Sequence, residues 1–117
     1  MKKILFLLII SVVNQSCKNE TEIQSPLVCG VMDPIKELAW LDNILSGNGD
    51  CEIYGGASLY SYRYKGVTVL NLRNPASSLG ICTELYYDCS GKKLFSTVKE
   101  QNNFKARRTD EKLLWKK

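Results

Sequence analysis

With 117 residues, the chain is long enough for one compact domain and no more. It contains no histidine, so it lacks the commonest general base and the commonest metal ligand of proteins. Once the two lysines of a predicted signal peptide are removed, the formal net charge of +4 falls to +2, from 14 basic and 12 acidic residues. So weak a charge, in a protein expected to be exported, predicts no nucleic-acid partner.

Residues 1–16 are predicted to be a secretory signal peptide. Lys2 and Lys3 precede a run of mostly apolar residues from Ile4 to Val13, which is the charged-then-apolar order of such a peptide. The run is shorter than the roughly 20 residues that a membrane-spanning helix needs. Only Ser11 interrupts it, whereas a core helix would carry a polar face. We therefore expect an exported protein.

Cys17 is predicted to be the lipidated first residue of the mature chain. The small Ser16 directly before it resembles the processing site of bacterial lipoproteins, in which the cysteine receives a diacylglyceryl thioether and an acylated amine. Asn14 departs from that pattern, because an aliphatic residue is usual at its position. Ordinary cleavage, with Cys17 as a free thiol or a disulfide partner, is the alternative. Lipidation would hold the protein on a membrane, most simply the outer membrane, with residues 17–28 as lipidated cysteine and polar tether.

Four cysteines remain beyond the tether, an even number that predicts two disulfides in an oxidising compartment. No pair has the C-x-x-C spacing of a zinc site, so we predict no metal and no cofactor. Two of the four are expected on one strand, seven residues and roughly 23 Å apart, and a bridge needs Cα atoms within about 7 Å. Each should therefore bond one of the other two, in either of two connectivities. The strand pair is Cys82 and Cys89, and their partners are Cys29 and Cys51.

Residues 29–117 are predicted to form a single domain that begins with a helix. Asp33 suits its N-cap, Pro34 its first turn and Gly47 its left-handed C-terminal cap. Apolar side chains recur on one side of this segment. A hairpin should follow, with strands at residues 58–64 and 67–72 around the turn Lys65-Gly66.

A second hairpin is predicted from strands at residues 83–89 and 93–98 around Ser90-Gly91. Residues 113–115, Leu-Leu-Trp, must bury their side chains in a terminal strand or in a short helix capped by Thr109. The resulting expectation is an α+β fold, in which one N-terminal helix packs on an antiparallel β-meander of about four strands.

The quoted segments resemble a family of small Bacteroidota lipoproteins. Its members begin with a Cys-Gly-Val-x-Asp-Pro element, found here at residues 29–34, and have segments similar to Leu-Ala-Trp-Leu, Tyr-Lys-Gly and Tyr-Asp-Cys-Ser-Gly at residues 38–41, 64–66 and 87–91. Family members often have proline where this chain has Ala39. The resemblance implies a lipoprotein and brings no catalytic residues with it.

No catalytic residue is predicted. Ser90 has neither the sequence context of a nucleophile elbow nor a histidine to activate it. The glycines have no phosphate-loop spacing. The acidic residues that could form an acid–base pair are scattered over the helix and a Gly-rich loop; they are Asp33, Glu37, Asp42, Asp50 and Glu52.

One feature could indicate binding: Tyr60, Tyr62 and Tyr64 fall on one face of their strand and could form an aromatic platform for a glycan or a peptide. Tyrosine is also a preferred strand residue, so a half-buried face beneath the helix explains the row equally well. The leading hypothesis is a non-enzymatic envelope binding module with a protein or glycan partner. The alternatives are a small enzyme acting on envelope glycan or peptide polymers and, by fold analogy, a cystatin-like inhibitor.

Overall fold

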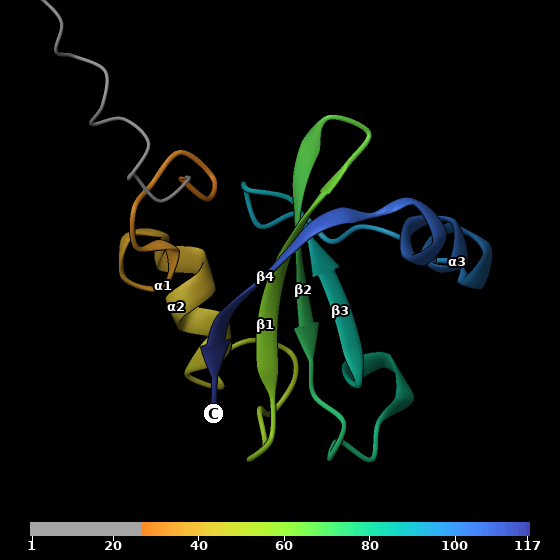
Figure 1. Ribbon diagram of the computed structural model, residues 1–117. Helices are drawn as coiled ribbons and strands as arrows, with labels where there is room; N and C mark the ends of the chain where they lie inside the picture. Colours follow the sequence, from red (N-terminus) through yellow and green to blue (C-terminus); the bar gives the residue numbers. More distant parts are fainter. Residues whose placement is uncertain (1–26) are drawn as a thin grey trace, which may run out of the picture.

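The computed structural model describes residues 27–117, so the predicted signal peptide and Cys17 lie outside the described residues. No helix within this range is long and apolar enough to cross a membrane. In chain order (Figure 1) the elements are α1 (Pro34–Glu37), α2 (Ala39–Leu45), β1 (Ser58–Tyr64), β2 (Val67–Arg73), the 3-10 helix η2 (Gly80–Cys82), β3 (Glu84–Tyr87), α3 (Val98–Arg107) and β4 (Thr109–Lys116).

The four strands form one antiparallel sheet in the order β3-β2-β1-β4. The β1–β2 hairpin is the one predicted, and its ladder runs from the pair Ser58–Arg73 to the pair Tyr64–Val67. Lys65 and Gly66 form its turn with φ angles of 51° and 80°, as a tight type I′ turn requires. The alternation of β1 therefore decides which side chains reach each face of the sheet.

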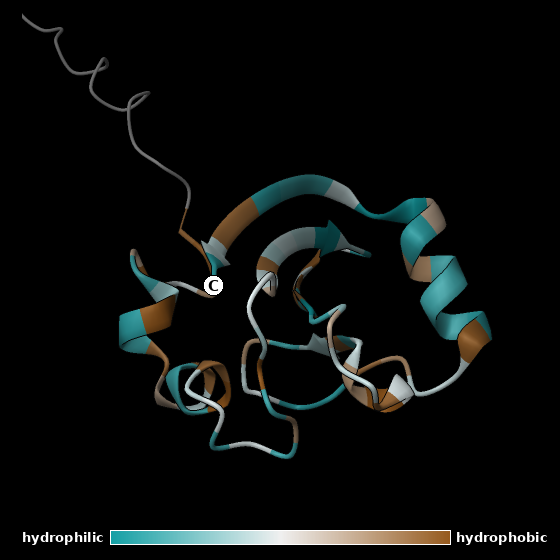
Figure 2. Cartoon of the chain, turned by 90° about the horizontal axis from the view of Figure 1, so that it is seen from below, coloured by the Kyte–Doolittle hydropathy of each residue, from teal (hydrophilic) through white to brown (hydrophobic). Residues whose placement is uncertain are grey.

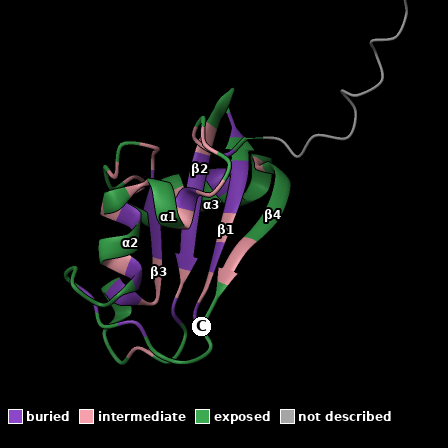
Figure 3. Cartoon of the chain, turned by 90° about the vertical axis from the view of Figure 1, so that its left-hand side faces the viewer, coloured by how far each residue is buried: buried purple, intermediate pink, exposed green. Residues whose placement is uncertain are grey.

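Helices cover both faces of the sheet (Figure 3). On one face, Leu41 and Leu45 of α2 share a buried cluster with leucines of the strands, including Leu59, Leu70 and Leu72. On the other face, Phe104 of α3 is buried with tyrosines of β1 and β3. The sheet is thus the middle layer of three, and each face has its own core.

The predicted architecture of one N-terminal helix on a meander is wrong, although the α+β class is confirmed. The fourth strand is β4, which pairs with β1 on the side away from β2, so the strand order is not that of a meander. Of the two alternatives for residues 113–115, the terminal strand is the observed one.

The predicted strand at residues 93–98 is absent from the described chain. After the turn at Asp88, only Lys93 bridges back to Tyr87, and α3 begins at Val98. Thr97 and Glu100 form a reciprocal capping box, in which each side chain accepts the other residue's backbone N–H. This box stabilises the helix start and ends the extended segment.

The predicted N-terminal helix is split in two at Leu38, which is extended (φ −104°, ψ 101°). After this break, Trp40 packs on the turn that follows β3. There its indole N–H donates to the Cys89 carbonyl at 3.1 Å. A Cβ at Gly91 would lie 2.8 Å from the Trp40 ring, so the close approach requires glycine. Tertiary packing therefore overrides the helical continuity that the sequence favoured.

Replacing Ala39 with proline should stabilise the protein by about 0.4–1 kcal/mol. Ala39 is the first residue of α2, where proline is favoured, and the extended Leu38 suits a residue before proline. Among residues 27–117, the Ala39 N–H donates no backbone hydrogen bond beyond those inside the helices and strands, so proline would remove no such bond. Chemical denaturation measures the effect, with Asp42→Pro inside α2 as a destabilised control. A loss of stability in Ala39→Pro would indicate a continuous helix.

Both predicted disulfides are present, and the structure chooses between the open connectivities. Cys29 bonds Cys89 and Cys51 bonds Cys82, with Cα–Cα distances of 5.3 and 5.7 Å. Cys82 and Cys89 lie at opposite ends of β3 rather than within it, which still prevents them from pairing with each other. One bridge fastens the segment before α1, and the other fastens the loop after α2.

Candidate functional site

The predicted tyrosine row lies on the α3 face of the sheet. Tyr62 is 2% exposed and Tyr64 is 8% exposed, and the Phe104 ring lies 5.4 and 5.3 Å from theirs. The helix over these rings is therefore α3 and not the helix that carries Trp40. Only Tyr60, which is partly exposed, remains accessible to a ligand.

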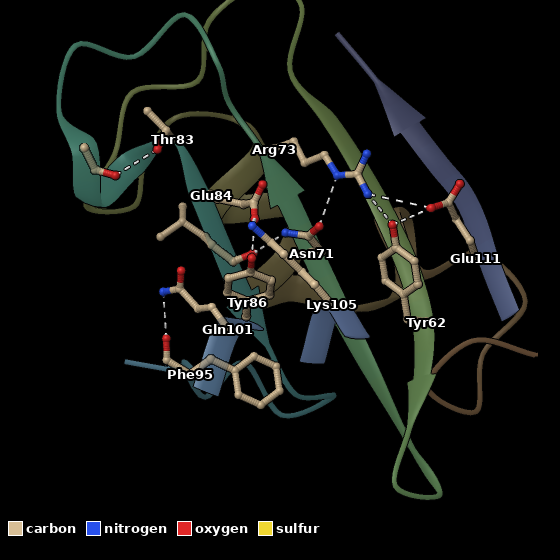
Figure 4. Close-up of polar contacts among 12 residues, drawn as sticks. Tyr62, Asn71, Arg73, Thr83, Glu84, Tyr86, Phe95, Gln101, Lys105 and Glu111 are labelled. Atoms are coloured by element: carbon tan, nitrogen blue, oxygen red, sulfur yellow. Dashed lines mark hydrogen bonds and ion pairs between the residues drawn. The ribbon is translucent and has the colours of Figure 1, made fainter. Parts of the chain in front are cut away.

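Beyond the edge of α3, the same face carries a network of polar side chains around Arg73 (Figure 4). The Arg73 guanidinium lies over the Tyr60 ring, 4.1 Å from its centre. It donates from Nε to Asn71 Oδ1 at 3.1 Å and from Nη2 to the Tyr62 hydroxyl. Tyr62 in turn donates to Glu111 Oε1 at 2.6 Å, and Arg73 lies 3.7 Å from the same oxygen. Strands β1, β2 and β4 thus each contribute to this Arg73 network.

A second polar group lies beside the network on β3 and α3. Tyr86 donates to Glu84, and Lys105 Nζ lies 3.1 Å from the same carboxylate oxygen. Figure 4 shows Glu84 and Tyr86 on β3, with Lys105 reaching them from α3. The ion pair is a polar contact between α3, which is mostly hydrophilic (Figure 2), and the sheet.

Arg108 completes the face at the C-terminal end of α3. Its guanidinium lies 4.5 Å from the centre of the Tyr62 ring and 5.6 Å from that of Phe104. Its side chain enters no hydrogen bond or ion pair with any of residues 27–117. Two stacked arginines, Arg73 and Arg108, therefore both contact Tyr62 on this face.

On this face the pKa values of two tyrosines are raised and that of one glutamate is lowered, so all three lie further from neutral pH than usual. Burial, followed by the hydrogen bond to Glu111, raises the pKa of Tyr62 to about 12. Burial and the hydrogen bond to Glu84 also raise the pKa of Tyr86. Burial alone would raise the pKa of Glu84, but hydrogen bonds from Tyr86 and Lys105 outweigh it and hold the pKa below its ordinary value. At neutral pH both phenols are protonated and Glu84 is a carboxylate.

Glu84 should make the stability of the fold depend on acid pH. Because its pKa is lower in the folded chain, its contribution is fully present above the unfolded value of about 4.3 and is lost as the pH falls through the folded value. We expect the free energy of unfolding to decline more gently on acidification in Glu84→Gln and in Lys105→Met than in the wild type. Denaturant titrations between pH 2 and pH 6 measure this, and equal slopes in all three proteins would contradict the ion pair's role.

The acidic residues considered in the sequence do not converge on one site. Asp33 caps α1, and Glu37 accepts the Asp33 backbone N–H at 2.8 Å. Asp50 pairs with Lys93 at 3.3 Å on the surface. Ser90 donates to Asp88 within a tight turn. Within residues 27–117, no three Asp, Glu or Cys side chains are grouped as a metal site would need.

Two open grooves border the sheet. One, of about 670 Å³, runs beside β3 and is lined by the exposed Leu79 and Ile81 among other residues. The other, of about 540 Å³, lies beside β1 and the start of β4. Its lining includes Ser61, Arg63 and Thr68, which lie on the face of the sheet opposite the tyrosine row, so this groove does not open onto the Arg73 network.

No protein-family model matches the chain, and neither a curated protein nor a solved structure matches it. The resemblance to Bacteroidota lipoproteins thus depends on the quoted segments alone.

Sequence reasoning missed both arginines and Glu111. Arg73 could have been found, because the predicted hairpin register places Tyr60 opposite Asn71 and therefore puts Arg73 on the tyrosine face. Arg108 and Glu111 could not, because their positions depend on α3 and on the pairing of β4 with β1.

Proposed function

We propose that the protein is an exported lipoprotein, anchored through Cys17 in a bacterial membrane, most simply the outer membrane, and acting as a non-enzymatic binding module of the cell envelope. The observation that carries export is the pair of disulfides, Cys29–Cys89 and Cys51–Cys82. Structural disulfides persist in oxidising compartments and are rare where thiols are kept reduced. The predicted signal peptide at residues 1–16 agrees with this compartment.

Binding is favoured over catalysis by the chemistry of the Arg73 network and of the Glu84 group beside it. A general acid or base works best with a pKa near the operating pH. The pKa of Tyr62 is raised to about 12, and that of Glu84 is lowered. Such groups hold one protonation state and one geometry, which suits recognition of a partner.

The two alternative functions, a small envelope enzyme and a cystatin-like inhibitor, each require a feature that can be checked. A small envelope enzyme should show turnover of purified peptidoglycan or of an envelope peptide, and we expect none. The cystatin-like analogy relied on one helix across a single face of the sheet. The described sheet has helices on both faces, so that analogy loses its basis.

Metabolic labelling with an alkyne analogue of palmitate tests the anchor. We expect the wild-type protein to incorporate the label and Cys17→Ser to lose it. Ser16→Ala keeps a small residue before the cysteine and should be labelled as the wild type is. An unlabelled wild-type protein, or a labelled Cys17→Ser variant, would overturn the lipid anchor.

A further inference from the structure

We propose that Arg73 and Arg108 together form a receptor for a carboxylate side chain of a peptide segment. This inference rests on the proposed function and names the ligand class of the binding module. Its basis is that two guanidinium groups, one from β2 and one from the end of α3, both contact Tyr62 on a face that α3 leaves partly open.

Both guanidinium groups are held in place before any ligand arrives. Arg73 is stacked on Tyr60 and fixed through Nε and Nη2, and Nη1 has no partner among residues 27–117. Arg108 is partly buried and stacked on Tyr62, and none of its N–H groups has a protein acceptor in the described chain. An arginine with a fixed plane and free donors loses little entropy on binding a carboxylate, which matches its fork geometry.

The charges on this face favour a single carboxylate over a polyanion. Three cations, Arg73, Lys105 and Arg108, lie with two carboxylates, Glu84 and Glu111, which leaves one net positive charge. A chain of phosphates or sulfates would be repelled by the two glutamates. One added carboxylate would neutralise the face.

The apolar surroundings favour a peptide over an acidic glycan. Leu113 is paired with Tyr60 across β1 and β4 and is 50% exposed, so an apolar side chain next to the bound carboxylate can contact it. A sugar ring would need a free aromatic face for stacking. The Tyr60 ring already contacts Arg73 and lies 6.2 Å from the Tyr62 ring in a stacked arrangement.

The test is a titration of the native exported protein in detergent micelles, followed through the arginine Nε–Hε signals in NMR spectra. The probe is the capped peptide acetyl-Ala-Leu-Glu-Ala-amide. Its isostere with glutamine in place of glutamate, methyl glucuronide and inorganic phosphate serve as competitors. We expect the glutamate peptide to shift the Arg73 and Arg108 signals saturably and the glutamine isostere to bind at least about 10-fold more weakly, since charge-assisted bonds are roughly twice as strong as neutral ones.

Arg108→Gln should weaken binding of the glutamate peptide at least about 10-fold, whereas Arg107→Gln, the matched control at the exposed neighbouring arginine, should leave it unchanged. Equal binding of the two peptides, no binding, or an Arg108→Gln variant with wild-type affinity would overturn the proposal. Tighter binding of methyl glucuronide would assign the site to an acidic glycan instead, and tighter binding of phosphate to a general anion site. Each of these outcomes leaves the palmitate-labelling result untouched, so failure of the receptor is distinguishable from failure of the anchor.

Discussion

Replacing Phe104 with alanine should lower the free energy of unfolding by about 3–5 kcal/mol. Phe104 is fully buried and is the one buried residue of α3. Its ring lies within 5.5 Å of four others, which are those of Tyr62, Tyr64, Tyr86 and Phe95. Since the rest of α3 is largely hydrophilic, this side chain provides most of the apolar attachment of the helix to the sheet.

Chemical denaturation under oxidising conditions measures this loss, and the tyrosines that α3 covers should become more accessible to solvent in the variant. Val98→Ala is the matched control, because Val98 lies on the same helix and is 72% exposed. Its substitution should change stability by less than about 0.5 kcal/mol. A Phe104→Ala variant that loses less than about 1 kcal/mol would show that α3 is held mainly by polar contacts such as Lys105–Glu84.

Removing the Cys29–Cys89 disulfide by a double serine substitution should cost about 4 kcal/mol. The bridge joins residues 60 positions apart and closes most of the described chain into one loop. It also holds the segment before α1 against the turn on which Trp40 packs. Its removal should therefore loosen the α1–α2 layer as well as stabilise the unfolded chain.

The Cys51–Cys82 bridge is the control, because its separation of 31 residues is about half as long. Each doubling of a closed loop adds about 0.6 kcal/mol of closure entropy, so the longer bridge should be the more costly to lose by about that amount. Denaturation of both double variants gives the two free energies. A shorter bridge that contributes clearly more than the longer one would contradict the account.

The first hairpin could be predicted from local sequence because its signals are local. Residues 58–64 have tyrosine at every second position from Tyr60, and Lys65-Gly66 supplies the two positive φ angles of its turn. The cysteines could be paired in part, since the strand between Cys82 and Cys89 keeps the two apart. Both predictions depend on geometry within one short segment.

One error has a local cause, and the others arose where segments distant in sequence decide the structure. Residues 93–98 have strand composition, yet the capping box of Thr97 and Glu100 starts α3 there. That box could have been read from the sequence. By contrast, the break at Leu38 results from Trp40 meeting the turn at Cys89, and no residue near 38 indicates it. The pairing of β4 with β1 likewise has no local signal, so the three-layer arrangement could not be predicted.

The candidate site also combines a feature visible in the local sequence with features that only the tertiary structure determines. The tyrosine row was visible in the sequence, but which helix covers it depends on α3, and that helix leaves only Tyr60 accessible. The charged residues around it come from separate strands and from the end of α3. Their grouping therefore emerges from tertiary structure, and the ligand inferred for it comes from that grouping rather than from any motif.

The intact mass of the native protein, extracted in detergent and measured without reduction, tests the central claim most directly. We predict one chain that begins at Cys17, carries the mass of a diacylglyceryl group and an N-linked acyl chain, and lacks four hydrogens because of the two disulfides. Reduction should add those four hydrogens and leave the lipid mass in place. An unmodified cysteine at position 17, a different first residue, or four free thiols in the native protein would contradict an exported, lipid-anchored module.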